Sequence, residues 1–249
     1  MELRIVNPDP RYSRVNLLEP APFGYLHMAA AVRPRRVPLA PRGRWKRAFL
    51  NRLVELASRL EDVATVEKAT VYDAVAFAPP SSYVKERSGA VHVARFDVVV
   101  LVETTSPDAV RVVRASPECQ AVLEALRAEA ADLHVIAARN LKRVGDVDKA
   151  RPGTFLFNYF VGDDPAVVTR LWDYMAGWYQ VETGMDNSTL LAPLEGESSD
   201  YVIINHARWD GSVLRFVVRQ FSRRSFRTYM LANLKANRVG AMPVLYRLA

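Results

Sequence analysis

The sequence has a single cysteine, Cys119, among its 249 residues, so no disulfide can form within the chain. This fits a reducing compartment, and we expect a cytoplasmic protein. No stretch approaches the roughly 18 consecutive apolar residues that a membrane-spanning helix needs, so we expect no membrane partner. The first residues hold acids and prolines without an apolar core, which is not the pattern of a secretory signal.

The short motifs of the common cofactor sites and nucleophiles are missing as well. No GxGxxG, Walker A or GxSxG segment occurs in the chain. Neither CxxC nor HExxH spacing occurs, and four scattered histidines with one cysteine do not indicate zinc. We interpret Cys119, which follows a predicted helix start, as a packing residue. We therefore expect neither a metal nor a cofactor.

Acidic residues are lacking in two segments of a chain whose net charge is +7. Asp210 is the one acid in residues 201–249. Residues 33–52 hold none, and their charges are Arg33, Arg35, Arg36, Arg42, Arg44, Lys46, Arg47 and Arg52. Such a run is typical of a solvated loop and helix start, and it could also dock an acidic partner. Only Trp45 is interleaved with these cations, which argues against nucleic acid.

The hydrophobic pattern predicts one order of elements twice. Proline at the first helical position, after a capping Ser or Asp, marks helix starts at Ser106-Pro107, Ser116-Pro117 and Asp164-Pro165. The first half then reads as strand 24–33, helix 44–61, strands 65–77 and 90–104, helical region 107–131 and strand 133–141. The second half reads as a strand from 154, helix 165–182, strands 188–194 and 200–209, helical turns 212–236 and a final strand 241–249.

Each half is therefore a ferredoxin-like β-α-β-β-α-β unit. The halves also align in sequence, with Asp97 on Asp200, Ser116 on Ser222 and Cys119 on Ser225. Two such sheets can pack their bare faces together and enclose a cavity. We predict an α+β fold in which two tandem ferredoxin-like units pack sheet to sheet as an intramolecular α+β barrel. Residues 1–23 form an N-terminal arm that covers the barrel mouth, 24–150 the first unit and 151–249 the second.

Two short motifs carry a family resemblance. One is Ser106-x-x-Ala109 with Ser116-Pro117, and the other is Trp209-Asp-Gly-Ser212 followed by Phe216, Ser222 and Phe226. Both resemble the dimeric α+β barrel superfamily, which includes the antibiotic-biosynthesis monooxygenases. The resemblance implies a fusion in which one chain closes the barrel that smaller members form by dimerising. The sequence leaves undecided whether the chain also forms a homo-oligomer through its outer helix faces.

The resemblance also suggests where site residues would lie. Small members that degrade haem carry Asn on the first strand, Trp at the end of the third strand and His on the following helix. Asn158 and Trp209 match the first two, but Arg219 and Gln220 stand where the His would be. A chlorite dismutase-like plan would need an axial histidine in the second half, where His206 is the one present.

The segment DYVIINHARWD, residues 200–210, is an apolar strand that ends in a polar cluster. Side chains alternate along a strand, so Asn205 and Trp209 share one face while His206 and Arg208 share the other. The sequence does not decide which face lines the barrel. We predict catalytic roles for Asn205, His206, Arg208 and Trp209. The predicted substrate-binding set is Tyr25, His27, Asn158, Tyr159, Tyr201 and Arg219.

Three functions follow as hypotheses. The first is a cofactor-independent oxygenase, cyclase or isomerase that holds a hydrophobic aromatic or polyketide-like molecule in the barrel pocket. The second is a haem-binding protein with His206 as axial ligand and arginines at the propionates. The third is a non-enzymatic ligand-binding or assembly protein whose basic segment 33–52 docks an acidic partner.

Overall fold

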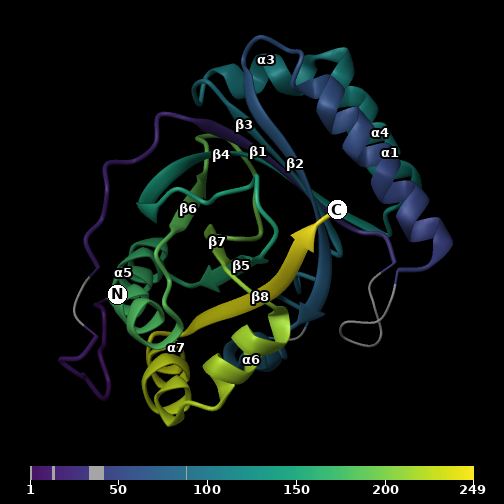
Figure 1. Cartoon of the computed structure of the whole chain (residues 1–249). Coiled ribbons are helices and arrows are strands. Elements are labelled where there is room, and N and C mark those ends of the chain that lie inside the picture. The colour runs from purple at the N-terminus through teal and green to yellow at the C-terminus, as the bar shows by residue number, and fades with distance from the viewer. Residues whose placement is uncertain (1, 13–14, 34–41, 88) are drawn as a thin grey trace.

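Eight antiparallel strands close into one barrel in a computed structural model that describes residues 2–12, 15–33, 42–87 and 89–249. The strand order is β1-β3-β2-β8-β5-β7-β6-β4. Figure 1 shows helices packed outside this barrel, with α1, α3 and α4 on one side and α5, α6 and α7 on the other. The fold is thus mixed α+β.

The elements of the first half are β1 (Gly24–Ala31), α1 (Arg44–Leu60), β2 (Val66–Phe77), α2 (Ser82–Glu86), β3 (Val98–Thr104), α3 (Ala109–Ala115), α4 (Pro117–Glu129) and β4 (Asp132–Gly145). Those of the second half are β5 (Thr154–Gly162), α5 (Pro165–Thr183), β6 (Ser188–Pro193), β7 (Ile203–Trp209), α6 (Val213–Phe221), the π-helix η1 (Phe226–Leu231), α7 (Ala232–Ala236) and β8 (Val239–Leu248).

Both halves arrange their strands alike. The sheet order is β4-β1-β3-β2 in the first half and β8-β5-β7-β6 in the second, so each half runs fourth, first, third, second. The halves join where β2 pairs with β8 and β4 pairs with β6. This order is consistent with two tandem ferredoxin-like units whose outer strands pair with each other and so leave no free sheet edge.

Two of the three predicted helix caps are confirmed. Ser116 accepts a hydrogen bond from the Cys119 amide, and Asp164 accepts from the amides of Ala166 and Val167. The third helix begins later, with Asp108 rather than Ser106 as its N-cap.

The predicted strand 90–104 is wrong in its first part. β2 ends at Phe77 just before the Ala78-Pro79-Pro80 run, and β3 begins only at Val98. A long connection with the short helix α2 takes up the residues between them. Proline lacks the amide that a sheet ladder uses, so β2 cannot continue through this run and the long connection begins there. The connection matters below, because it reaches across β8 to the second half.

The barrel interior is packed with side chains, many of them aromatic. Phe96, Phe155, Phe157, Tyr159 and Tyr246 are fully buried there. The outer face of the first sheet is covered by a separate apolar cluster shared with α1, α3 and α4. Among the described residues, a buried aromatic cluster therefore occupies the interior where the sequence predicted a central cavity.

Part of the basic segment is internal rather than solvated. Arg42 Nε lies 2.8 Å from Asp73 Oδ2, and Lys46 Nζ lies 2.5 Å from Asp97 Oδ2. Both carboxylates are buried, so each needs a cation to offset its lost hydration. These pairs fasten the start of α1 to β2 and β3. Arg35 and Arg36 lie outside the described residues.

The N-terminal arm runs along the second half. The amides of Arg4 and Val6 donate to the side chains of Asn237, which caps α7, and of Asn233 within α7. Leu18 then pairs with Arg143 on β4. The described arm residues therefore hold the outside of the second half to the edge of the first (Figure 1).

His92 links the two halves at one end of the barrel. Its Nε2 lies 2.6 Å from Asp132 Oδ2 at the start of β4, and its Nδ1 lies 2.7 Å from Asp200 Oδ2 before β7. A carboxylate only accepts, so both ring nitrogens must donate and the ring is an imidazolium. Partial burial lowers the pKa of His92, but the hydrogen bonds to Asp200 and Asp132 outweigh it and raise that pKa above its usual value.

We expect this bridge to make stability fall as pH rises. The pKa of His92 is raised in the folded state. The stabilisation that the bridge provides is therefore complete below the unfolded-state pKa near 6.5, and it is lost as pH rises through the folded-state pKa. Thermal melts of the wild type should show a lower midpoint at pH 9 than at pH 7. The His92→Gln variant should show a smaller drop, and an equal drop in both proteins would contradict the bridge.

Candidate functional site

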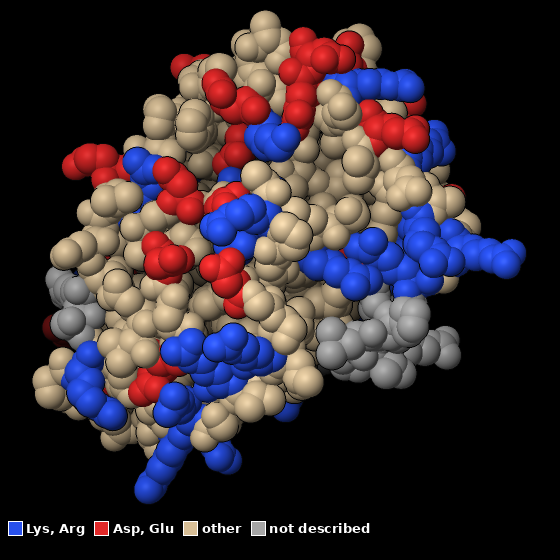
Figure 2. All heavy atoms as spheres, viewed as in Figure 1, with Lys and Arg blue, Asp and Glu red and all other residues tan. Residues whose placement is uncertain are grey.

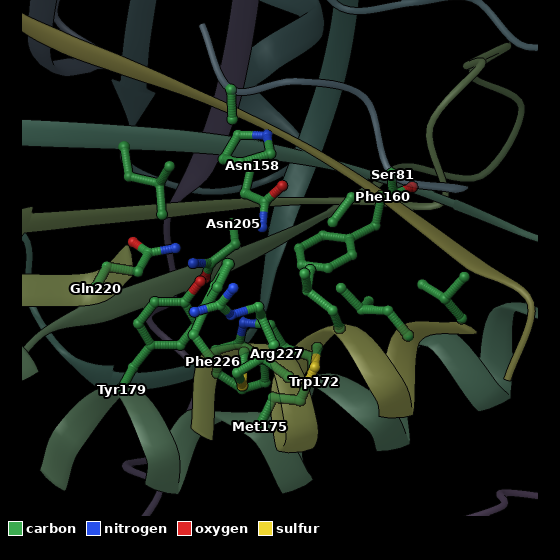
Figure 3. A pocket seen from close by; sticks show the side chains of 18 of the residues that line it. Ser81, Asn158, Phe160, Trp172, Met175, Tyr179, Asn205, Gln220, Phe226 and Arg227 are labelled. Atoms are coloured by element: carbon green, nitrogen blue, oxygen red, sulfur yellow. The ribbon is translucent and has the colours of Figure 1, made fainter. Parts of the chain in front are cut away.

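A cavity of about 530 Å³ lies between the outer face of the second sheet and its helices. It is therefore outside the barrel, between strands β5, β7 and β8 and helices α5, α6, η1 and α7 (Figure 3). The volume suits a small organic ligand. Its apolar wall includes Leu156, Phe160, Trp172, Met175, Tyr179, Trp209, Phe226 and Met230.

Segment 78–85 of the first half closes one side of this cavity. Residues 78–82 and Lys85 belong to the long connection after β2, and they line the cavity together with Pro243 of β8. The backbone amide of Ala78 donates to the Pro243 carbonyl at 3.1 Å, which fixes the segment to β8. The buried hydroxyl of Ser81 has no hydrogen-bond partner among the described residues. Both halves therefore contribute to one site.

Two asparagines form the polar floor of the cavity. Asn158 on β5 and Asn205 on β7 stand opposite each other across the strand pair. Asn205 Oδ1 accepts from the Ser188 hydroxyl at 2.6 Å, which leaves the Asn205 N–H groups for the cavity. Asn158 Oδ1 is buried and has no hydrogen-bond partner among the described residues. Figure 3 shows the two amides side by side, with Gln220 of α6 nearby.

The first half has no counterpart of this floor. Its outward-facing pairs on β1 and β3 are Leu26 with Val102 and Met28 with Val100. All four are fully buried in the apolar cluster beneath α1, α3 and α4. An amide in such a place is costly unless it is hydrogen-bonded. The asparagine pair thus marks the second half as the half with a site.

Aromatic side chains are fixed around the floor. Trp209 Nε1 donates to Thr183 Oγ1 at 3.0 Å, and the Trp209 ring packs on Phe216. Burial raises the pKa of the Tyr179 hydroxyl, which therefore stays neutral. Flat, rigid walls of this kind suit a planar aromatic ligand.

The charges at the cavity have one sign. No Asp, Glu, His or Cys is among its described lining residues. Lys85, Arg227 and Lys235 line it from exposed positions, and none of the three has an ion-pair partner among the described residues. The interior offers neutral amides, and the rim offers positive charge.

Several residues predicted for one site lie elsewhere. Asn158, Asn205 and Trp209 line the cavity. Five others belong to the barrel interior on the opposite side of the sheet, namely Tyr25, His27, Tyr159, Tyr201 and His206.

His206 is fully engaged inside the barrel. Its Nδ1 donates to the Leu156 carbonyl at 3.0 Å, and its Nε2 accepts from the Tyr72 hydroxyl at 3.2 Å. The ring stacks on Phe157 with 4.2 Å between centroids. Burial, helped by the positive charge of Lys149, lowers the pKa of His206 to about 3. The neutral ring is a core component that does not reach the cavity.

Arg208 and Arg219 also lie away from the cavity. Arg208 is buried and donates through Nη2 to the Pro152 carbonyl and to Asp210. Arg219 is exposed and donates to the Glu182 carbonyl. Both serve local structure, and neither lines the cavity.

Comparison with known proteins shows which solved structures share this fold. No family model matches the chain, and no curated protein matches its sequence. Among solved structures, an anthrone oxidase-like protein matches with a TM-score of 0.58 at 12% identity over 91% of both chains. A proposed monooxygenase from Fusobacterium nucleatum matches with 0.54 at 8% identity, over 93% of this chain and 94% of that one. A dye-decolorizing protein from V. cholerae matches with 0.50 at 12% identity, over 94% of this chain and 95% of that one.

The chain has the fold of the dimeric α+β barrel superfamily. This confirms the resemblance seen in the Ser106 and Trp209 motifs. Within this superfamily fold, Gln220 of α6 lies in the cavity with Asn158 and Trp209. Of the two residues at the place where the resemblance predicted a histidine, Gln220 lines the cavity and Arg219 does not.

A haem held by histidine does not fit this cavity. His206 is on the other side of the sheet with both nitrogens bonded, and the described lining holds neither histidine nor cysteine. A group of three or more His, Cys, Asp or Glu able to hold a metal ion is also absent from the described residues.

Sequence reasoning missed Trp172, Tyr179, Phe226 and segment 78–85. Trp172 and Tyr179 are apolar helix positions that read as ordinary core in any amphipathic pattern, and Phe226 was noted only as part of a family motif. Segment 78–85 reaches the site because β2 pairs with β8, and this pairing could not be predicted from the sequence. Gln220 did carry a signal, since it stands next to the place of the superfamily's histidine.

Proposed function

We propose that the protein is a cofactor-independent oxygenase of a planar aromatic or polyketide-like molecule bound between the second sheet and helices α5 to α7. The observation that carries this proposal is the pair Asn158 and Asn205 on the floor of an otherwise apolar, aromatic-walled cavity. The names of the anthrone oxidase-like and monooxygenase relatives agree with it. The tandem ferredoxin-like plan completes the cavity, because it brings segment 78–85 of one unit to the other.

The amides would act on a carbonyl or phenolic oxygen of the ligand. N–H groups of Asn205 aimed at that oxygen stabilise the negative charge it carries when the neighbouring carbon loses its proton. Asn158 Oδ1 can accept from a ligand hydroxyl and so fix the orientation of the ring. Trp209, Tyr179 and Phe226 hold the ring plane and exclude water.

The electrons for such a reaction come from the ligand itself. Loss of a proton gives a carbanion that can reduce O₂ directly. The balanced reaction is R₂CH₂ + O₂ → R₂C=O + H₂O, in which one oxygen atom enters the product and the other leaves as water. No carboxylate or histidine lines the described cavity to accept the proton, so it passes to water at the mouth. The cationic rim favours the deprotonated ligand.

We expect Asn205→Ala to reduce turnover of an anthrone-type substrate about 100-fold or more, as for loss of one oxyanion donor. Oxygen uptake and product analysis in the presence of a chelator measure this. Asn187→Ala is the matched control, because Asn187 is a buried asparagine that bonds to the Arg208 backbone outside the cavity. Equal turnover by wild type and Asn205→Ala would refute the site assignment.

A further inference from the structure

Helix α6 carries apolar side chains on an exposed face as well as on its buried face. Val213 and Phe216 are buried against the protein. Leu214, Val218 and Phe221 are 60%, 57% and 45% exposed. These three, here called the α6 stripe, are spaced four and three residues apart and so share one face of the helix. An exposed apolar face of this kind is normally covered, and nothing in the described chain covers the α6 stripe.

The surface around the α6 stripe is strongly basic. No Asp or Glu occurs from residue 211 to the end of the chain. Arg215, Arg219, Arg224 and Arg227 are exposed on α6, η1 and the turn between them. Figure 2 shows basic side chains gathered toward the lower part of the molecule, where α6 and α7 lie in Figure 1.

Acids also border this region: Asp186 and Asp210 line a small pocket with Arg215 and Arg219, and Glu182 reaches the region from α5. Glu182 pairs with Arg223 at 3.2 Å, and its carboxylate also accepts from the Tyr12 hydroxyl. This ion pair neutralises Arg223, whereas Arg215, Arg219, Arg224 and Arg227 have no ion-pair partner among the described residues.

The stripe is continuous with the cavity mouth. Phe221 belongs to the stripe and also lines the cavity, and Leu231 of η1 is 41% exposed and lines it too. Arg227, at the start of η1, joins the basic surface to the same mouth. An object seated on the stripe would therefore cover the entrance.

We propose that the α6 stripe and its arginines dock the protein on the surface of an anionic lipid bilayer, with the cavity mouth toward the lipid. Helices with Leu, Val and Phe on one face and arginines beside it lie in the plane of the membrane interface and bind anionic lipid. This needs no membrane span, and none of the described helices is long and apolar enough to be one. A second copy of the chain fits less well, because a two-fold contact would bring two arginine-rich surfaces together.

The proposal is independent of the reaction in the cavity, and co-sedimentation with vesicles tests it. The full chain should bind phosphatidylcholine vesicles that contain phosphatidylglycerol and should bind pure phosphatidylcholine much more weakly. Arg215→Gln and Arg224→Gln should each weaken binding roughly five-fold, and added salt should weaken it further. Val218→Ser should weaken binding by roughly five- to ten-fold through lost apolar burial.

The matched control is Val112→Ser, because Val112 is 63% exposed on α3 at the other side of the barrel. It should bind vesicles like the wild type. Equal binding to both vesicle types, or equal loss in the Val112 and Val218 variants, would overturn the proposal. So would a dimer in sedimentation velocity without lipid that Val218→Ser dissociates, because the stripe would then be a contact between copies.

Discussion

The protein should unfold in mild acid, losing about 5 kcal/mol or more of stability between about pH 6.5 and pH 4.5 because of histidines inside the barrel. Burial lowers the pKa of His206 to about 3 and that of His134 to about 4. Burial also lowers the pKa of His27, with the charges of His134 and His206 acting in the same direction. Neither His27 Nδ1 nor His134 Nδ1 has a hydrogen-bond partner among the described residues.

The sign follows from the direction of these shifts. Below the unfolded-state pKa near 6.5, the histidines of the unfolded chain bind protons that the same histidines do not bind inside the folded barrel. Stability therefore falls as pH falls toward the folded-state pKa values. Each pH unit costs about 1.4 kcal/mol per histidine, and a whole domain has only about 5–15 kcal/mol. His92 acts in the opposite direction, because its folded pKa is raised.

Urea unfolding across this pH range measures the effect. The His206→Gln variant cannot take up the proton, so its stability should depend less steeply on pH although its stability at pH 7.5 is lower. Histidine NMR should show three rings that stay neutral below pH 6 while the protein is folded. A wild-type slope below that of a single histidine would mean that the interior is open to water.

Asn158→Leu should have opposite effects on stability and on ligand binding. The free energy of unfolding should rise by about 1–3 kcal/mol, because an unpartnered buried amide oxygen is replaced by the type of side chain that the first half carries at Leu26. Affinity for an aromatic ligand with a hydroxyl should fall at least ten-fold, because the acceptor is gone. A gain in stability with a loss of function is typical of a residue retained for function.

Asn205→Val is the matched variant. It should weaken ligand binding as well, but it should lower stability by about 1 kcal/mol, since the Ser188 hydroxyl loses its acceptor. Thermal melts with and without ligand give both quantities. If Asn158→Leu lowered stability, the amide would have a structural partner and the cavity would lose its main polar recognition group.

The two halves of the barrel share their strand order but differ in the outward positions over which the cavity lies. These positions are Leu26 with Val102 in the first half and Asn158 with Asn205 in the second. In the second half the helices also pack differently, because the π-helix η1 begins at Phe226 and places its ring in the cavity. Wide turns of this kind often occur at functional sites.

The sequence alone determined most of the elements and much of the fold. Strand and helix patterns are local, so the β-α-β-β-α-β order, the caps at Ser116 and Asp164 and the buried Cys119 could all be predicted. The alternation along β7 also separated Asn205 and Trp209 from His206 and Arg208. The superfamily resemblance was a consequence of the same local motifs.

Only the tertiary structure decided which face of β7 lines the cavity. A strand presents two faces with equal regularity, and the choice depends on what packs against each of them. The interior face meets Tyr72 and Phe157, which fill the barrel and fix His206 as a neutral core residue. The outer face meets α5, α6 and η1, whose packing leaves a cavity over the asparagines. The closure of β2 on β8, which sequence periodicity cannot encode, then brings segment 78–85 to the same cavity.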